Sequence, residues 1–540
     1  MDNMSFKKIS KDKIKGWLNE EILGLLPSTF FKDPVFSIQT MGGNVIKESR
    51  RRWAAIFILP NGQRIFLKRD RTKGWIESLK YFLLPTKARK EWIIAYQLKK
   101  RNLDIPTPLG WIERSHWGFV KESYYFSEAI GSGVSLIEDS ERIGDRFPLL
   151  DLVKAVKKIH NAGLFHKDLH AGNFLWNENS FFLTDLHRAK IVKSLSLNQR
   201  LWNLSHLFHS LRSIWGEKEQ IRFLEEYFER EPPYFQKREE LLQKIHSLMG
   251  RLQRRQWRSR TKRCLKESTE FSVKKEEGIH YYHRKDYPLN CLKKVIEEHL
   301  SLVRERPFAL VKNSPRVTVS ILNDGIDKIG VKQFRYPRVW DIFKENFRRS
   351  KGLKSWVAGN GLITRGIPSL KPLALMESRN WFGLKGSFFL MEALENDQEL
   401  DRYMLKGFKD FREKRFFIKT FAQWLSHFHG MDLYHQDMKT CNILVSENGE
   451  SWNFHLLDLE DVLLNKKVDE KKLFKNFLQL NTSTPKIITR TDRFRFFKEY
   501  LYFRPVIQNR KNFLHQLIEE SRKRGLVYVS PDGVVIEEMN

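Results

Sequence analysis

The chain has 540 residues, and its 96 lysines and arginines outnumber the 65 aspartates and glutamates, giving a formal net charge of +31. A chain of this length forms two to four domains, and a hydrophobic content of 41% is too high for a disordered protein. No apolar run reaches the roughly 18 residues that suggest a membrane-spanning helix. The N-terminal segment lacks the apolar core of a signal peptide, and the three cysteines form no CxxC pair. We therefore expect a cytoplasmic, globular protein without a disulfide framework or a zinc site.

The positive surplus favours an anionic partner, and it is concentrated in one segment. Residues 251–266 contain eight lysines and arginines and no acidic residue. Nucleic acid, an acidic membrane surface, a phosphorylated substrate or simply a solvated surface would all fit this charge. We expect Arg254, Arg255, Arg258 and Lys262 to bind an anionic membrane or substrate. Nucleic-acid binding is disfavoured because no recognition module is visible.

The first half of the chain predicts strands followed by helices. Residues 1–35 are expected to form an amphipathic extension. Residues 54–68 alternate apolar and polar side chains around a Pro-Asn-Gly turn, which predicts a β-hairpin. Residues 90–101 have a helical pattern, residues 108–130 contain further strands, and residues 147–163 form a helix that ends on a glycine. A β-rich lobe is therefore followed by a helical lobe.

The second half repeats this order. Residues 317–332 predict a hairpin around Asn-Asp-Gly, residues 372–377 and 386–394 predict strands, and residues 416–430 predict a helix that again ends on glycine. Single residues repeat too, at an offset that grows from 264 at Lys68 and Lys332 to 273 at the segments 183–186 and 456–459. Such an ordered series predicts a duplicated domain of about 250 residues. We expect copies over 36–250 and 301–540, joined by a basic connector at 251–300.

Each helical lobe contains the pattern His-x-Asp-x-x-x-x-Asn, followed by a strand-like segment that ends in a second aspartate. Phosphoryl transfer needs a carboxylate that accepts the proton of a hydroxyl, oxygen ligands for Mg²⁺, and a lysine for the phosphates of ATP. A single His-x-Asp would more often be a turn, but the whole set occurs twice. The predicted bases are Asp168 and Asp437, the predicted Mg²⁺ ligands are Asn173, Asp185, Asn442 and Asp458, and the predicted phosphate-binding lysines are Lys68 and Lys332.

With these residues, both halves resemble the protein-kinase fold, an α+β fold with a β-rich N-lobe and a helical C-lobe. In particular they resemble the lipopolysaccharide core kinase family, bacterial enzymes that phosphorylate heptose or Kdo. The resemblance covers about 40–245 and 305–505, and it includes Lys47 and Ser49 before the first hairpin and the turn 365–368 after a helix. It implies ATP- and Mg²⁺-dependent phosphorylation of a lipid-linked, anionic sugar at the cytoplasmic face of the inner membrane.

The sequence also departs from ordinary protein kinases. Neither half has a Gly-x-Gly-x-x-Gly loop, and neither second aspartate is followed by Phe-Gly. We expect Lys47 and Ser49, and their counterparts Lys312 and Ser314, to contact phosphate in place of that loop. These absences favour a small-molecule kinase over a eukaryotic-type protein kinase.

The two halves differ in the partner of the phosphate-binding lysine. Glu91 stands in the first helix where a kinase holds Lys68, whereas the equivalent position of the second half is Ser355. We therefore expect half one to be catalytic and half two to bind nucleotide but turn over slowly, unless Glu345 or Glu377 holds Lys332. Lys439, two residues after Asp437, could compensate by stabilising the transferring phosphoryl group. The alternatives are a regulatory pseudokinase scaffold and a kinase of another acceptor, such as an aminoglycoside, choline or protein.

Overall fold

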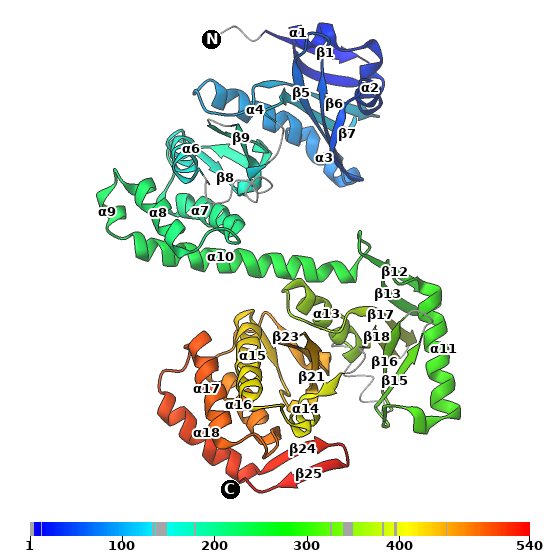
Figure 1. Cartoon of the computed structure of the whole chain (residues 1–540). Coiled ribbons are helices and arrows are strands. Elements are labelled where there is room, and N and C mark those ends of the chain that lie inside the picture. Colours follow the sequence, from blue (N-terminus) through cyan, green and yellow to red (C-terminus); the bar gives the residue numbers. More distant parts are fainter. Residues whose placement is uncertain are drawn as a thin grey trace. The chain divides into compact units, whose positions relative to one another are not determined.

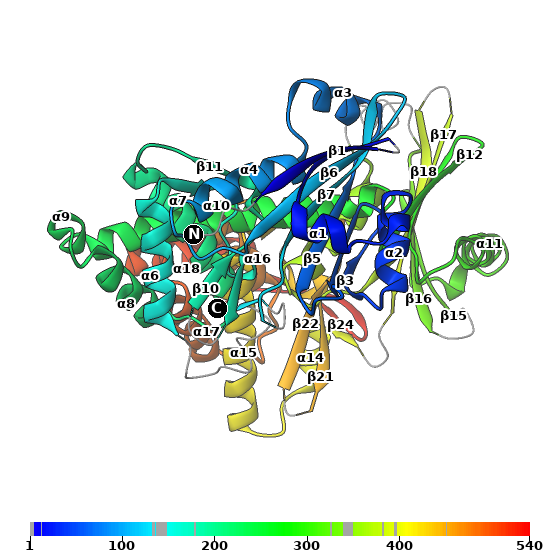
Figure 2. The same ribbon diagram turned by 90° about the horizontal axis from the view of Figure 1, so that it is seen from above.

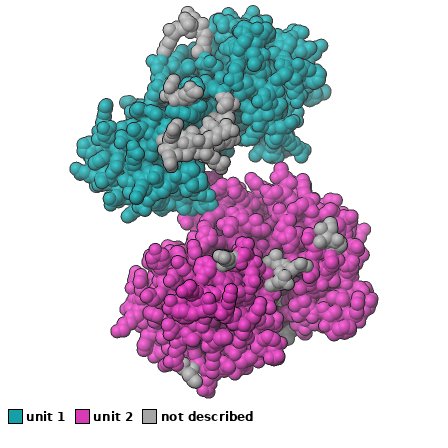
Figure 3. Space-filling model, in the orientation of Figure 1, with its two compact units in different colours: residues 1–253 teal, residues 254–540 magenta. Residues whose placement is uncertain are grey.

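The computed structural model divides the chain into two compact units, residues 1–253 and 254–540 (Figure 3). It describes residues 5–11, 13–131, 135–136, 148–177, 180–323, 327–337, 349–380, 383–393, 397–449 and 451–539. Each unit has a β-rich part followed by a helical part along the chain, as Figure 1 shows.

Unit 1 begins with a seven-stranded antiparallel sheet in the order β1-β2-β6-β7-β5-β4-β3. Its strands are β1 (Phe6–Lys11), β2 (Ile14–Asn19), β3 (Asn44–Glu48), β4 (Arg52–Ile58), β5 (Arg64–Arg71), β6 (Pro108–His116) and β7 (Phe119–Glu128). Helices α1 (Glu20–Leu25) and α2 (Pro34–Thr40) share a core with the sheet around the fully buried Phe30 and Trp53. Helix α3 (Trp75–Leu83) packs on β7, and α4 (Lys87–Lys99) packs on β6 and β7.

The helical part of unit 1 surrounds two short two-stranded sheets, and the loops next to their strands carry the predicted catalytic residues. The strands are β8 (Leu164–His166), β11 (Ala189–Ile191), β9 (Phe174–Asn177) and β10 (Ser180–Leu183), with β8 paired to β11 and β9 to β10. The helices are α6 (Leu149–Asn161), α7 (Leu197–Leu211), α8 (Glu217–Phe228), α9 (Pro232–Phe235) and α10 (Arg238–Thr261). Their apolar faces, with α4, enclose one continuous core, which fixes the two small sheets in place.

Unit 2 contains a sheet of the same strand order, β12-β13-β17-β18-β16-β15-β14. Its strands are β12 (Phe271–Glu276), β13 (Ile279–Arg284), β14 (Lys312–Asn313), β15 (Val317–Asn323), β16 (Lys328–Arg335), β17 (Pro372–Asn380) and β18 (Gly383–Glu392). Helix α11 (Leu289–Glu305) stands beside this sheet (Figure 2) and shares a core with it through Leu292 and Val295, while α13 (Lys351–Thr364) packs on β17 and β18.

The helical part of unit 2 is larger than that of unit 1. Its strands are β19 (Gln398–Glu399), β20 (Leu433–His435), β21 (Ile443–Asn448), β22 (Ser451–Leu456), β23 (Val462–Leu464), β24 (Leu526–Ser530) and β25 (Gly533–Glu537). Its helices are α14 (Leu400–Lys406), α15 (Phe411–Gly430), α16 (Glu470–Ser483), α17 (Arg490–Phe503) and α18 (Arg510–Arg524). Again β20 pairs with β23 and β21 with β22, so the loop around Asp437 is framed like the loop around Asp168.

The structure departs from the expected domain boundaries at the start of each sheet. Residues 5–11 and 13–35 form no separate extension, because β1 and β2 lie within the first sheet. Residues 251–300 form no separate connector, because they contain the end of α10, the outer strands β12 and β13, and part of α11. Both outer hairpins are rich in lysine, as exposed sheet edges often are, and this composition resembles a solvated surface in the sequence.

Candidate active site

A cavity of about 300 Å³ in unit 1 lies between the sheet and the hairpin β9–β10. One part of its wall is apolar, with Ala54, Ile56 and Leu175 among the lining side chains. The other part is polar, and the sequence-predicted residues gather there: Lys47, Lys68, Glu91, Asn173 and Asp185 all line it. A cavity with an apolar part and a charged part suits a nucleotide, whose base is apolar and whose phosphates are anionic.

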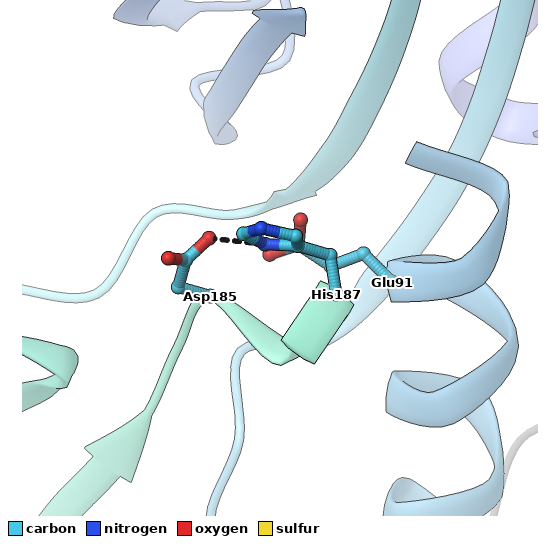
Figure 4. Close-up of side chains that lie close together, drawn as sticks. All are labelled: Glu91, Asp185 and His187. Carbon is cyan, nitrogen blue, oxygen red and sulfur yellow. Dashed lines mark hydrogen bonds and ion pairs between the residues drawn. The ribbon is translucent and has the colours of Figure 1, made fainter. Parts of the chain in front are cut away.

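Lys68 is held between two carboxylates that come from different elements. Its Nζ lies 3.1 Å from Oε2 of Glu91, which projects from α4, and it also contacts Oδ1 of Asp185. His187 Nδ1 lies 2.7 Å from the same Asp185 oxygen, and Figure 4 shows this contact with the Glu91 side chain beside it. The predicted pairing of Lys68 with Glu91 is thus present in the geometry.

The charges of this cluster fix its protonation. Burial opposes the lysine cation, but Glu91 and Asp185 raise the pKa of Lys68 above its ordinary value. Burial likewise opposes the Asp185 carboxylate, but Lys68 and His187 lower its pKa well below the ordinary range. Both groups therefore stay charged at neutral pH.

The loop that carries Asp168 is built on a buried histidine. His166 Nδ1 accepts a hydrogen bond from the Asp168 backbone at 3.2 Å, so its Nε2 carries the proton and donates to the Asp185 carbonyl at 3.1 Å. Burial lowers the pKa of His166, which keeps the ring neutral. This histidine links the predicted base to the predicted metal ligand, and it positions the loop rather than reacting.

Asp168 is held as a carboxylate by two cationic or donor side chains. Arg188 Nη1 lies 2.6 Å from its Oδ2, and His206 Nδ1 lies 3.4 Å from its Oδ1. The hydrogen bond from His206, against the effect of burial and with the charges of His170 and Arg188, lowers the pKa of Asp168 to about 2. A carboxylate of this kind can accept a proton from a hydroxyl in the transition state.

The oxygen donors nearby fit a magnesium ion. Asn173 donates its amide hydrogen to the Asp168 carbonyl at 2.9 Å, which leaves its Oδ1 as an acceptor, and the Asp185 carboxylate lies on the same cavity wall. Amide and carboxylate oxygens are the ligands that Mg²⁺ prefers. Among the described residues, Glu91, Asp185 and His187 also bring their ligand atoms within 4.8 Å of one another.

Unit 2 repeats the catalytic loop. His435 Nδ1 accepts from the Asp437 backbone at 3.1 Å, its Nε2 donates to the Leu457 carbonyl at 3.2 Å, and Asn442 donates to the Asp437 carbonyl at 2.8 Å. Lys439 Nζ lies 3.1 Å from Asp437 Oδ1, as expected for a lysine placed beside the base.

The lysine of unit 2 is paired, which contradicts the expectation that Ser355 leaves Lys332 without a glutamate to hold it in place. Lys332 Nζ lies 2.6 Å from Asp458 and 2.9 Å from Oε1 of Glu460. Of the two alternatives considered from the sequence, Glu377 instead bonds Ser350 and lies 3.5 Å from Arg379, and Glu345 lies outside the described residues. Glu460 was visible in the sequence DLED, two residues after Asp458, but the repeat aligned it with His187.

A sequence model of the lipopolysaccharide kinase (Kdo/WaaP) family matches residues 38–227 and 340–500, which is more than half of the chain. The chain belongs to this family. The match confirms the resemblance inferred from the two Lys, Asp, Asn and Asp sets. No protein of the curated collection that was compared matches the chain.

Two solved structures share more distant similarity with this family member. A structure described as WaaP in complex with acyl carrier protein has 21% sequence identity and a TM-score of 0.33, over 44% of this chain and 98% of that one. A Stt7 homologue from Micromonas algae, soaked with ATP, has 13% identity and a TM-score of 0.22, over 28% of this chain and 50% of that one.

The serines of the two Lys-x-Ser motifs have a different local role in this kinase-family chain from the expected phosphate contact. Ser49 Oγ donates to the Arg52 carbonyl at 3.0 Å and also accepts from the Arg52 amide, which closes the turn between β3 and β4. Ser314 closes the turn before β15 with Val317 in the same way, at 2.8 Å. Lys47 lines the cavity of unit 1, and the charge of Lys312 helps to lower the pKa of Asp458.

Sequence reasoning missed the residues that contact the two predicted catalytic aspartates and their loops. His206 contacts Asp168, and at the matching position, 273 residues later, Gln479 donates to Asp437 at 3.2 Å. Asn203 and Asn476, also 273 apart, bond the carbonyls of the loop histidines His166 and His435. The repeat offset could have revealed both pairs, because it holds at the later match of 221–228 with 494–501.

Proposed function

We propose that this protein is an ATP- and Mg²⁺-dependent kinase that phosphorylates a sugar hydroxyl of the lipopolysaccharide core, on heptose or Kdo. The observation that carries the proposal is the charged part of one cavity wall, where Lys68, paired with Asp185, lines the cavity together with Asn173. The side-chain amide of Asn173 also bonds the backbone carbonyl of Asp168 at 2.9 Å, which ties the loop of the proposed base to this wall. Family membership supports the substrate class.

In the proposed reaction, Asp168 accepts the proton of the sugar hydroxyl as the oxygen bonds to the γ-phosphorus of ATP. The bond from that phosphorus to the β–γ bridging oxygen breaks, and ADP leaves. Lys68 binds phosphate oxygens, and Asn173 and Asp185 would hold Mg²⁺ through their side-chain oxygens. Bound Mg²⁺ would neutralise charge on the phosphate oxygens.

We further propose that the two units are tandem copies of one bilobal kinase-like fold. Their sheets have matching strand orders. Even the edge contacts match: Phe6 of β1 packs on Trp92 at 5.4 Å between ring centres, and Phe271 of β12 packs on Trp356 at 5.8 Å. Phe6 and Phe271 are 265 residues apart and Trp92 and Trp356 are 264 apart, which agrees with the offset of the repeat.

An acidic membrane surface is the partner proposed for helix α3, which would place the protein peripherally at the inner membrane. Only Ser78 of α3 is buried, where it donates to the Val120 carbonyl at 3.0 Å, while Trp75 is 69% and Leu83 is 91% exposed. Trp117, in the nearby β6–β7 turn, is 85% exposed. No helix in the described part of the chain is long or apolar enough to span a bilayer.

The charges around α3 favour an anionic partner. Its acidic residue, Glu77, is used internally, because it accepts from the Lys73 amide at 2.6 Å and from the Tyr81 hydroxyl at 3.2 Å. Lys73 and Lys80 are exposed. Exposed tryptophan and leucine with flanking lysines are typical of helices that lie in the surface of an anionic bilayer.

In the basic segment at the end of α10, Arg254 is half-buried and lies 3.4 Å from Asp432. Arg255 and Arg258 of the helix and Lys262 just after it are exposed. The exposed three remain available for an anionic surface, and each cation near such a surface contributes about 1 kcal/mol.

Vesicle co-sedimentation tests this membrane proposal. The triple variant Trp75→Ser, Ile76→Ser, Leu83→Ser should lose binding to phosphatidylglycerol vesicles, and higher salt should weaken wild-type binding. The control replaces three equally exposed apolar residues of unit 2, Phe308, Val534 and Ile536, by serine and should bind normally. Unchanged binding by the α3 variant would refute the role of α3, and loss of self-association instead would assign this face to a second copy of the chain.

Phosphate transfer from labelled ATP to dephosphorylated lipopolysaccharide core tests the kinase proposal. The wild-type chain should label the sugar in the presence of Mg²⁺, and the double variant Asp168→Asn, Asp437→Asn should not. Labelling only of an aminoglycoside, choline or a protein would move the activity to another acceptor. ATP binding without any transfer would instead favour the pseudokinase alternative.

A further inference from the structure

Two positions near the phosphate-binding lysine have exchanged roles between the units. In unit 1 the helix position carries Glu91 and the position two residues after the metal aspartate carries His187. In unit 2 the helix position carries Ser355 and the other carries Glu460. Each unit therefore keeps one glutamate beside the lysine, but the glutamate comes from a different element.

Glu460 is largely buried, and both of its carboxylate oxygens have hydrogen-bond partners. Its two carboxylate oxygens lie 2.9 and 3.0 Å from Lys332 Nζ, and its side chain is only 9% exposed. Ser355 Oγ donates to Glu460 Oε2 at 3.2 Å, so the helix residue now holds the carboxylate instead of supplying it. Burial alone would lower the pKa of Lys332, but Glu460 and Asp458 raise it, so the lysine remains a cation.

Small residues on α13 bring the short serine within reach of Glu460. A side-chain carbon at Gly359 would lie 2.5 Å from Pro372 and 3.1 Å from Leu459, the residue just before Glu460. A carbon at Gly352 would lie 2.6 Å from Ser387 of β18. The helix therefore packs closer to the sheet and to segment 458–460 than larger side chains would allow.

We propose that unit 2 is a second phosphotransfer centre in which Glu460 is the residue that positions Lys332. This inference rests on the proposed function of the chain. Asp437 is the base of this centre, Asn442 and Asp458 are its metal ligands, and Lys332 binds the phosphates of the nucleotide. Because a buried lysine held at both carboxylate oxygens is preorganised, the absence of a helix glutamate does not disable the centre.

Because of this exchange, a movement of the helix would affect the lysine of each unit differently. In unit 1 the Lys68 pairing depends on where α4 places Glu91. In unit 2 both partners of Lys332 belong to the three-residue segment 458–460, and α13 contributes only the Ser355 hydroxyl. A shift of the helix would thus break the Lys68–Glu91 pair in unit 1 and leave only the contact with Asp185, whereas in unit 2 both pairs of Lys332 would remain.

The test measures ATP hydrolysis and sugar phosphorylation by the full chain carrying Asp168→Asn, so that turnover reports on unit 2. Adding Glu460→Gln should lower kcat about 10- to 100-fold, with a smaller rise in KM for ATP. Ser355→Ala should cost less, about 2- to 5-fold, because it removes one hydroxyl donor to the Glu460 carboxylate but leaves both contacts of that carboxylate with Lys332. Glu519→Gln, at an exposed carboxylate of unit 2, is the matched control and should change neither constant.

The exchange variant Ser355→Glu, Glu460→His copies unit 1 into unit 2 and should recover most of the rate lost with Glu460→Gln. It also keeps the test decisive if Glu460→Gln unfolds, because it leaves Lys332 with a carboxylate. Unchanged kinetics of Glu460→Gln, or no ATP turnover by the Asp168→Asn chain, would overturn the inference. Glu460-dependent ATP hydrolysis without sugar labelling by any chain would overturn the proposed substrate and leave this inference standing.

Discussion

The two units hold the phosphate-binding lysine with different residues. Comparing them shows which contacts are common to both units and which residues can differ. Both hold a lysine between two carboxylates, but Glu91 reaches Lys68 from a helix and Glu460 reaches Lys332 from the segment after the metal aspartate. The requirement is therefore a buried carboxylate at the ammonium group, and its position in the sequence is free to change.

The surroundings of the two proposed catalytic aspartates differ in a similar way. Asp168 faces Arg188 and His206, whereas Asp437 faces Lys439 and Gln479. Each aspartate has one nearby cation, and each is contacted by a side chain at a matching position, His206 or Gln479. Asp437 also accepts from the Asn442 amide at 3.3 Å. The comparison predicts a small loss of activity when a residue is replaced by the one that makes the same contact in the other unit. It predicts a large loss when the contact is removed.

The largest effect in unit 1, short of removing the base, is expected from Asp185→Asn. This change removes a metal ligand and one partner of Lys68 at once. In an Asp437→Asn background it should lower the sugar phosphorylation rate on the order of 10²–10³-fold and raise the Mg²⁺ concentration needed for half-maximal rate. If Asp185→Asn needed the same Mg²⁺ concentration for half-maximal rate as the chain with Asp185, Asp185 would not be a metal ligand.

Glu91→Ser should cost about 10- to 100-fold in the same background, because unit 1 then has the helix residue of unit 2 without its second glutamate. Adding His187→Glu should restore much of that loss by supplying the carboxylate from the segment after Asp185. Steady-state kinetics of the single and double variants measure the rescue. A double variant no better than Glu91→Ser would mean that the two arrangements are not interchangeable.

Matched stability losses are expected at a buried cluster that both units share. His160 bonds Tyr227 at 2.7 Å and Asn203 at 3.2 Å, and His429 bonds Tyr500 at 2.9 Å and Asn476 at 3.2 Å. Burial lowers the pKa of each histidine to about 3, so both are neutral. His160→Ala and His429→Ala should each lower the free energy of unfolding by about 2–4 kcal/mol in their own unit, measured by hydrogen exchange. If only one of the two variants lowered the free energy of unfolding of its unit, the two clusters would not have the same structural role.

The smallest effect is expected from His206→Gln, which gives Asp168 the donor that Asp437 has. The hydrogen bond from His206 depresses the pKa of Asp168 to about 2, below its value in the unfolded chain of about 4. Its stabilising effect is therefore complete above pH 4 and is lost as pH falls through 2. The variant should raise this pKa and move the acid limb of the rate profile upward, with little change at pH 7. A downward shift would contradict the assigned cause.

The sequence predicted the elements that depend on local pattern. The hairpin around Asn61-Gly62, the helix that carries Glu91 and the two Asp-Asn loops are all present, because alternation, helical periodicity and turn residues are local signals. The edge strands β1 and β12 were missed, since their lysines resemble a solvated surface. Glu460 was missed because only packing in three dimensions shows that a helix and a loop can supply the same carboxylate.

The account claims that one chain carries two phosphotransfer centres, and the most direct measurement compares four chains in the sugar phosphorylation assay. These are the wild type, Asp168→Asn, Asp437→Asn and the double variant. The account predicts that each single variant keeps a Mg²⁺-dependent rate, that the two residual rates together approach the wild-type rate, and that the double variant has none. An Asp168→Asn chain as inactive as the double variant would contradict it and leave unit 2 as a non-catalytic domain.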